Sequence, residues 1–266
     1  MFFKDKLFIV LVLVLLIIGG ISLVIKLGDS TGNNARKIVV DDSSFTNIEI
    51  TAGNAAVEIV PTNDSATTVK YIGETKKKSK YVFKADINGD ILSIQFKEKR
   101  RGFFSFGFFN NDLKLLVEVP QKQYNKIQAE TDNGRINVEN IQAEEIVLET
   151  DNGTIELINV ETSTTDVETD NGKILLESVE GKIQGQTDNG RITLVTDNLD
   201  RSIELTTDNG RIEIQSEREP TNATIDVKTD NGRIDVFGYD NKHTRFGKGE
   251  NLIILRTDNG GVTVTK

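Results

Sequence analysis

Seven aspartates recur at similar spacing through the second half of the 266-residue sequence. Carboxylates in such a pattern suit two kinds of chemistry. A pair can act as general acid and base in cleaving a glycosidic bond, and a cluster of oxygen ligands can hold Ca²⁺. The seven are Asp132, Asp151, Asp170, Asp188, Asp208, Asp230 and Asp258. Because every copy supplies a carboxylate, a pair at catalytic spacing would arise by chance, so the pattern does not by itself indicate an enzyme.

Each aspartate belongs to the same four residues, Thr-Asp-Asn-Gly, which are typical of a tight turn. We therefore favour a structural interpretation. The carboxylate accepts the amide two residues further on in an Asx-turn, the glycine adopts a positive φ, and the asparagine amides of successive copies bond to one another. Basic residues follow five of the seven glycines and would offset the repulsion between carboxylates; they are Arg135, Lys173, Arg191, Arg211 and Arg233.

We predict no metal and no cofactor, because the glycine- and aspartate-rich nonapeptide that binds calcium in other β-rolls is absent. The seven aspartates remain weak candidates for Ca²⁺. The chain has no cysteine and one histidine, which excludes thiolate sites and metal sites built from several histidines. We expect that histidine, His243, to be an exposed loop residue.

Aromatic side chains, which sugar-binding faces usually carry, are few after residue 120; they are Tyr124, Phe237, Tyr239 and Phe246. We therefore predict no enzymatic activity. The alternative is a carbohydrate-active enzyme, a polysaccharide lyase or hydrolase on a β-helix scaffold. The net charge of −9 comes from an acidic excess after residue 120, which argues against nucleic acid as a partner because phosphates demand dense positive charge.

The elements that position the aspartates are expected to be short β-strands. The threonine of the motif stands at 131, 150, 169, 187, 207, 229 and 257, and a period near 20 residues is typical of stacked repeats. Apolar residues alternate with polar ones on both sides of the turn, which indicates strands. Each copy therefore contributes two strands with inward apolar side chains.

Three inward positions recur in every copy. Five residues after the threonine stand Ile136, Ile155, Ile174, Ile192, Ile212, Ile234 and Val262. Two residues further on stand Val138, Leu157, Leu176, Leu194, Ile214, Val236 and Val264. Four residues before the threonine stand Ile127, Ile146, Thr165, Ile183, Ile203, Ile225 and Ile253. In the first copies Ile141, Val160 and Val179 add a further inward position.

Asn-Gly between alternating strands also fits an antiparallel meander. A stack of coils fits better, because stacking places equivalent residues above one another and explains why one turn recurs. The extra residues of the two longest intervals, EREPTNA and GYDNKHTRFGKGEN, both follow the second strand, as insertions at one corner would. We predict an all-β β-solenoid, a single-stranded β-helix with coils of about 19 residues, in which the copy containing Gly260 forms one end.

The N-terminal segment predicts a membrane anchor. Residues 7–25, LFIVLVLVLLIIGGISLVI, carry no charge, and as a helix they would span roughly 28 Å, close to the hydrocarbon thickness of a bilayer. A cleaved signal peptide fits less well, since its apolar region is shorter and ends at a small-residue site. Lys4 and Lys6 place the first residues in the cytoplasm, so the rest of this single-pass protein is expected outside the cell membrane.

Four regions follow from these patterns. Residues 1–27 are the cytoplasmic tip and anchor, and residues 28–37 are a tether. Residues 38–120 form an irregular β-rich region that caps or starts the solenoid, with TAGN at 51–54 as a degenerate turn. Pro120 marks the start of the regular array, residues 121–266.

An aromatic segment precedes that boundary. Its phenylalanines are Phe103, Phe104, Phe106, Phe108 and Phe109, and Arg100 and Arg101 precede them. One interpretation is a cap over the open end of the stack. The other is an exposed tip that contacts an anionic membrane or a partner within it.

The stretches NIEITAGNAAVEIVP, GDILSIQFKEK and LKLLVEVPQKQYNKIQAETDNGRINVENI, with the repeats after them, resemble the bacterial putative-adhesin β-strand-repeat family of unknown function, which includes membrane-anchored LiaG-like members. The resemblance covers about residues 38–266 and implies no catalytic residue. It implies an adhesin or a stress-related scaffold of the cell envelope, with an envelope protein or a glycan as partner.

Overall fold

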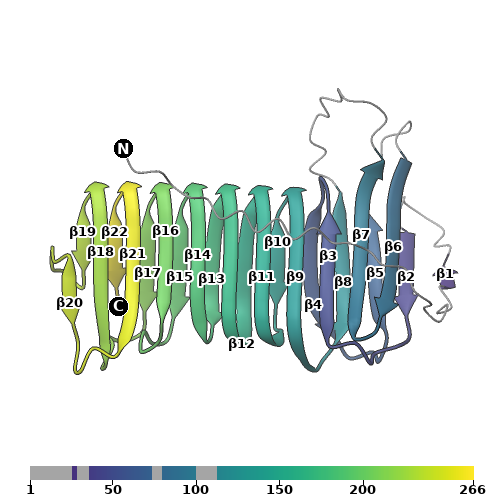
Figure 1. Ribbon diagram of the computed structural model, residues 1–266, viewed down its shortest axis with the longest axis horizontal. Helices are drawn as coiled ribbons and strands as arrows, with labels where there is room; N and C mark the ends of the chain where they lie inside the picture. The colour runs from purple at the N-terminus through teal and green to yellow at the C-terminus, as the bar shows by residue number, and fades with distance from the viewer. Residues whose placement is uncertain (1–25, 29–35, 74–79, 100–112) are drawn as a thin grey trace.

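The computed structural model describes residues 26–28, 36–73, 80–99 and 113–266. Every regular element in these ranges is a β-strand, so the all-β prediction is confirmed. No helix within them is long and apolar enough to cross a membrane, and the span expected over residues 7–25 lies outside them. The strands stand side by side along the long axis of the molecule (Figure 1).

The strands form two sheets, and the long strand β12 (Thr154–Asn171) contributes to both. Along the stack, sheet A contains β1 (Lys26–Gly28), β2 (Arg36–Val40), β5 (Thr67–Ile72), β8 (Lys114–Pro120), β4 (Ala56–Thr62), β10 (Ile136–Glu139), β12, β13 (Lys173–Val179), β15 (Ile192–Thr196), β17 (Ile212–Ser216), β22 (Val262–Thr265) and β19 (Ile234–Val236). Sheet B contains β6 (Lys80–Asn88), β7 (Ile91–Lys99), β3 (Asn47–Ala52), β9 (Gln123–Asn133), β11 (Gln142–Asn152), β12, β14 (Lys182–Asn189), β16 (Ile203–Asn209), β21 (Asn251–Asn259), β18 (Ala223–Asn231) and β20 (His243–Arg245).

Successive coils pair in parallel and in register. Ile136 stands beside Ile155, and Ile155 stands beside Ile174, so each side chain meets its own equivalent in the next coil. The same holds in sheet B, where Thr150 lies between Thr131 and Thr169. Parallel pairing between copies excludes the antiparallel meander for the repeat region.

The core lies between the two sheets. All residues at the three predicted inward positions are buried, including Thr165, and so are Ile141, Val160 and Val179. Burying one Ile, Leu or Val side chain stabilises the fold by about 1.5–3 kcal/mol. Since every coil contributes several, apolar burial along the whole stack holds the sheets together.

The order of the coils at the C-terminal end differs from the prediction. The last coil in sequence, β21 and β22, lies between the coil of β16 and β17 and the coil of β18 and β19. The chain passes over one position in the stack and then returns to fill it. Gly260 therefore lies inside the stack, and the coil of Gly232 is outermost.

The N-terminal end has the same inversion. Strands β3 and β4 lie between the coil of β7 and β8 and the coil of β9 and β10. The TAGN sequence ends β3 and begins the connection to β4, where Asn54 accepts a hydrogen bond from Asn133 (2.6 Å). Antiparallel strands close the ends: β6, β5, β2 and β1 at one, and β20 at the other (Figure 1).

Candidate functional site

The Thr-Asp-Asn-Gly turns form a continuous ladder of hydrogen bonds at one corner of the stack. In six of the seven copies the threonine hydroxyl donates to the carbonyl of the corresponding glycine in the adjacent coil; Thr169 to Gly153 (3.3 Å) and Thr257 to Gly210 (3.0 Å) are examples. In the first copy Thr131 donates to the carbonyls of Gly53 and Ala55, and Ala55 stands at the glycine position. The asparagine amides also bond from coil to coil, as Asn171 does to Asn152 at 3.0 Å. This asparagine ladder was predicted, and it is confirmed.

The reason for the glycine is different from the one predicted. None of the seven repeat glycines has a positive φ. A Cβ on Gly190 would instead lie 1.5 Å from the carbonyl oxygen of Gly172, and the other central copies are equally crowded. Positive φ occurs at another corner, at Asn140 (55°), which follows β10, and at Asn159 (53°), which lies within β12. The glycine is therefore required by close approach between coils.

The predicted Asx-turn is also wrong for most copies. The glycine amide donates to the asparagine carbonyl of the following coil, as in Gly190 to Asn209 (3.1 Å) and Gly210 to Asn259 (3.1 Å). In two copies the arginine after the glycine forms an ion pair, and its partner is a glutamate and not the aspartate of the turn. Arg135 pairs with Glu156 (3.5 Å), and Arg191 pairs with Glu213 (3.4 Å), both on sheet A.

The outward carboxylates of the first coils form an acidic strip on sheet B, which consists of Glu130, Glu149, Glu168, Asp132, Asp151 and Asp170. Burial, followed by the charges of Glu168 and Glu130, raises the pKa of Glu149. Burial, followed by the charges of Asp132 and Asp170, raises the pKa of Asp151. Both shifts mean that these neighbours disfavour one another's ionised form.

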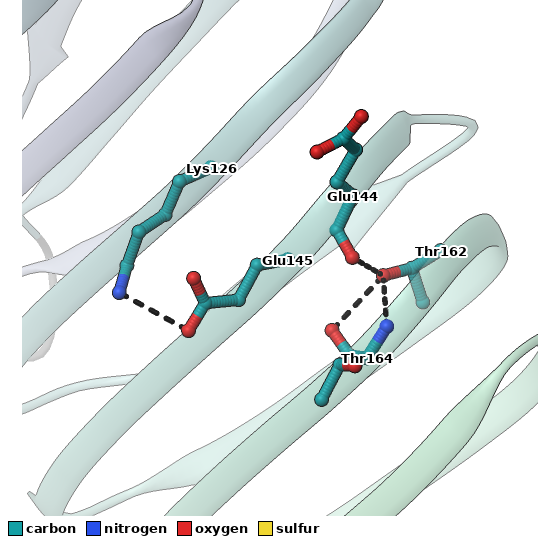
Figure 2. Close-up of polar contacts among 5 residues, drawn as sticks. All are labelled: Lys126, Glu144, Glu145, Thr162 and Thr164. Atoms are coloured by element: carbon teal, nitrogen blue, oxygen red, sulfur yellow. Dashed lines mark hydrogen bonds and ion pairs between the residues drawn. The ribbon is translucent and has the colours of Figure 1, made fainter.

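Further along the same strands, acidic side chains lie beside lysines. Lys126 reaches across to Glu145 (3.2 Å), as Figure 2 shows. Beside this pair the Thr162 hydroxyl bridges backbone groups of two coils, donating to the carbonyls of Glu144 and Thr164 (Figure 2). Burial and Glu145 raise the pKa of Asp166, while Lys182 and Lys126 oppose this shift.

Across the described ranges no three His, Cys, Asp or Glu side chains come close enough together to hold a metal ion. The ladder lines up the seven aspartates one per coil. His243 is exposed, as predicted, but it begins strand β20 and does not lie in a loop; it is 3.8 Å from Asp226 of the neighbouring strand β18. The residues Phe103, Phe104, Phe106, Phe108, Phe109, Arg100 and Arg101 lie outside the described ranges, so both interpretations of that segment stay predictions.

The few aromatic side chains of the repeat region mostly serve the fold. Tyr124 is buried, and its hydroxyl donates to the carbonyl of Pro120 (2.7 Å). Phe237 packs edge-on against Phe246 near the C-terminal end, and Tyr239 is exposed. Sequence reasoning missed Lys122, which lies over the rings of Phe45 and Tyr124 and donates to the carbonyls of Ser43 and Phe45. Burial lowers the pKa of this lysine, against the effect of Asp42.

The repetition is interrupted at a groove beside the turn corner. Its volume is about 730 Å³, and it is lined by Ala55, Ala56, Val57, Glu58, Lys114, Asn133, Gly134, Arg135, Asn137, Asn152, Gly153 and Thr154. The groove exists because small residues replace basic ones after the turn. Ala56 and Thr154 flank Arg135, whereas Lys173 occupies the same position in the next coil.

Fold and site together define a repeat protein of stacked β-coils, in which the recurrent polar motif holds coils together. The chain belongs to the Toastrack DUF4097 family, which it matches over residues 45–170 and again over residues 134–265. This confirms the family resemblance drawn from the sequence. No curated protein matches the chain.

The solved structures that are similar to the chain include three bacterial proteins. A putative cell adhesion protein from Clostridium sporogenes is 12% identical, with a TM-score of 0.45, over 87% of this chain and 99% of that one. A putative adhesin from Bacteroides fragilis is 11% identical, with a TM-score of 0.48, over 89% and 99%. A putative adhesin from Parabacteroides distasonis is 9% identical, with a TM-score of 0.32, over 87% and 98%.

Proposed function

We propose that this protein is a non-catalytic interaction protein of the bacterial cell envelope. Residues 7–25 anchor it in the cell membrane, and the stacked coils stand on the outer side. There the coils act as an adhesive surface or a scaffold for an envelope protein or a glycan. The charge-free run behind Lys4 and Lys6 supports the anchor and its direction.

One observation carries the proposal: the coils repeat in register along the stack, from β3 and β4 to β18 and β19. Such a body presents long faces whose outward side chains recur at the strand spacing of about 4.8 Å. Long, regular faces suit an extended or repeating partner, as the concave faces of other repeat proteins do.

The partner is sought by isolating the full-length protein from membranes after cross-linking in intact cells. We expect one or more envelope components to be retained. The variant Glu130→Gln/Glu149→Gln/Glu168→Gln tests sheet B, and Glu156→Gln/Glu177→Gln/Glu213→Gln is its matched counterpart on sheet A. Loss of a component in one variant alone would assign the face. If the wild type retains nothing, or if it shortens envelope glycans, the proposed function is wrong.

Topology is tested separately. Protease added to intact protoplasts should digest the coils and leave a membrane-embedded N-terminal fragment. Full protection of the coils, or a mature protein that lacks residues 1–25, would contradict the anchored topology.

A further inference from the structure

The groove beside the turn corner is the place where this stack departs from its own pattern. The residues that follow the turn run Lys114, Ala56, Arg135, Thr154, Lys173 and Arg191 from coil to coil. The short side chains of Ala56 and Thr154 thus separate Arg135 from the next basic residues on either side. The resulting volume, about 730 Å³, falls in the range of small-molecule sites.

The groove holds one loosely paired cation. Lys114 is already engaged by the carboxylate of Glu58. Arg135 is 3.5 Å from Glu156, and 60% of its side chain is exposed. A guanidinium in this state can bind a carboxylate through two parallel hydrogen bonds.

The remaining polar groups are neutral and offer both donors and acceptors. Asn133 and Asn152 each use part of their amide in the ladder. A carboxamide has two N–H donors and two oxygen lone pairs, so each keeps hydrogen-bonding capacity. The side-chain oxygen of Asn137, on the same wall, is buried without a hydrogen-bond partner.

This chemistry favours a sugar over a peptide. Vicinal hydroxyls are donors and acceptors at once and match side-chain amides. An extended peptide would need a free strand edge, but β4, β10 and β12 are paired on both sides along the groove. We propose that this groove binds a saccharide bearing a carboxylate, with Arg135 on the carboxylate and Asn133 and Asn152 on hydroxyls.

The inference rests on the proposed function and names the class of its partner. No aromatic ring lines the groove, so binding depends on hydrogen bonds and one charge. We expect a Kd of about 1 mM for a short oligomer.

The repeat itself supplies the decisive variant. Thr154→Lys fills the groove with the residue that the next coil carries at Lys173, so the coil should fold normally. Thr263→Lys adds the same charge to the outward side of sheet A far from the groove and is the matched control. Arg135→Gln removes the cation alone.

The full-length protein in lipid nanodiscs is titrated with tetragalacturonate, neutral maltotetraose and tetraglutamate. We expect tetragalacturonate to bind wild type and Thr263→Lys, and to bind Thr154→Lys and Arg135→Gln at least about tenfold more weakly. Equal binding by Thr154→Lys with an unchanged melting temperature would overturn the groove assignment. Equal binding of maltotetraose would overturn the role of the carboxylate, and stronger binding of tetraglutamate would identify a peptide site instead. If envelope components are still retained in any of these cases, only the groove assignment fails.

Discussion

The glycine of the turn lies so close to the neighbouring coil that no side chain fits there. In Gly190 a Cβ would meet a backbone carbonyl oxygen at 1.5 Å. Gly53 stands at the aspartate position of the TAGN turn, where Ala55 replaces the glycine, and the nearest atom to a Cβ on Gly53 is Asp132 Oδ2 at 3.9 Å. Gly190→Ala should therefore cost about 3 kcal/mol or more and lower Tm by roughly 6–12 °C. Gly53→Ala should change stability by no more than about 0.5 kcal/mol.

Thermal melts of the two variants check this contrast. Similar losses at both positions would show that the glycines serve something other than coil contact. Gly260→Ala is informative as well, because Gly260 lies as close to Gly210 as Gly190 does to Gly172. It should be as damaging as Gly190→Ala, although Gly260 belongs to the last coil in the sequence.

Glu149 carries the like-charge strain of the acidic strip. Its pKa is raised by burial and by Glu168, Glu130, Asp151 and Asp170, so the folded state binds its proton more tightly than the unfolded state does. The loss of folding stability caused by the charged Glu149 side chain is fully present above its raised pKa. It disappears as pH falls below the pKa of this side chain in the unfolded state, about 4.3. Glu149→Gln should therefore raise Tm at pH 7 by about 1–3 °C, since opposed like charges cost up to about 1 kcal/mol.

The gain should shrink as pH falls toward 4, because the folded wild-type protein then takes up the proton on Glu149. Melts from pH 4 to pH 8 provide the measurement, with Glu144→Gln at an exposed position outside the strip as control. A gain that does not depend on pH would mean that charge is not its cause.

At the scale of the strand, the sequence was sufficient to place the inward residues. Period-2 alternation identified them, and burial of Ile136, Thr165 and Val262 alike follows from their position in the coil. The order of the coils could not be predicted in this way. Each of the seven repeat coils offers the same threonine, asparagine and glycine to its neighbours, so any one of them fits against any other. The order depends on the connections over 217–222 and 237–250, which carry no periodic signal.

The site was predicted less well, because its determinants act between coils. The asparagine ladder could be foreseen, since identical amides stack. The role of the glycine could not be foreseen, because close approach between coils and a positive φ both select glycine. The groove at Ala56 and Thr154 had a signal in the sequence, namely two small residues where lysine or arginine usually stands.

The arrangement of the aspartates along the strands leads to a prediction about calcium binding. Its carboxylates stand one per coil, and no cluster of three potential ligands is formed in the described ranges. Millimolar Ca²⁺ should therefore shift Tm by less than about 1 °C, since a ligand stabilises only the state that binds it. Melts of the wild type and of Asp170→Asn/Asp188→Asn check this. A large shift that the double variant abolishes would establish a calcium site.

At the scale of the molecule, the C-terminal end of the chain is built into the stack. The coil of β21 and β22 is covered on both sides, and the connection that passes it is held at Asp200, which accepts hydrogen bonds from Thr221 and Asn222. Burial opposes these bonds, but together they lower the pKa of Asp200. A chain end that lies between two coils cannot fray without opening the stack.

This order of coils is tested most directly by engineered disulfides, since the chain has no cysteine of its own. Glu204 is the in-register neighbour of Ile254, and Ile254 lies between it and Asp226. Adjacent strands are about 4.8 Å apart, within reach of a disulfide, and strands two positions apart are not. On oxidation Glu204→Cys/Ile254→Cys should form an intramolecular disulfide on a non-reducing gel, and Glu204→Cys/Asp226→Cys should not. The opposite result would mean that the coils stack in sequence order and would contradict the account.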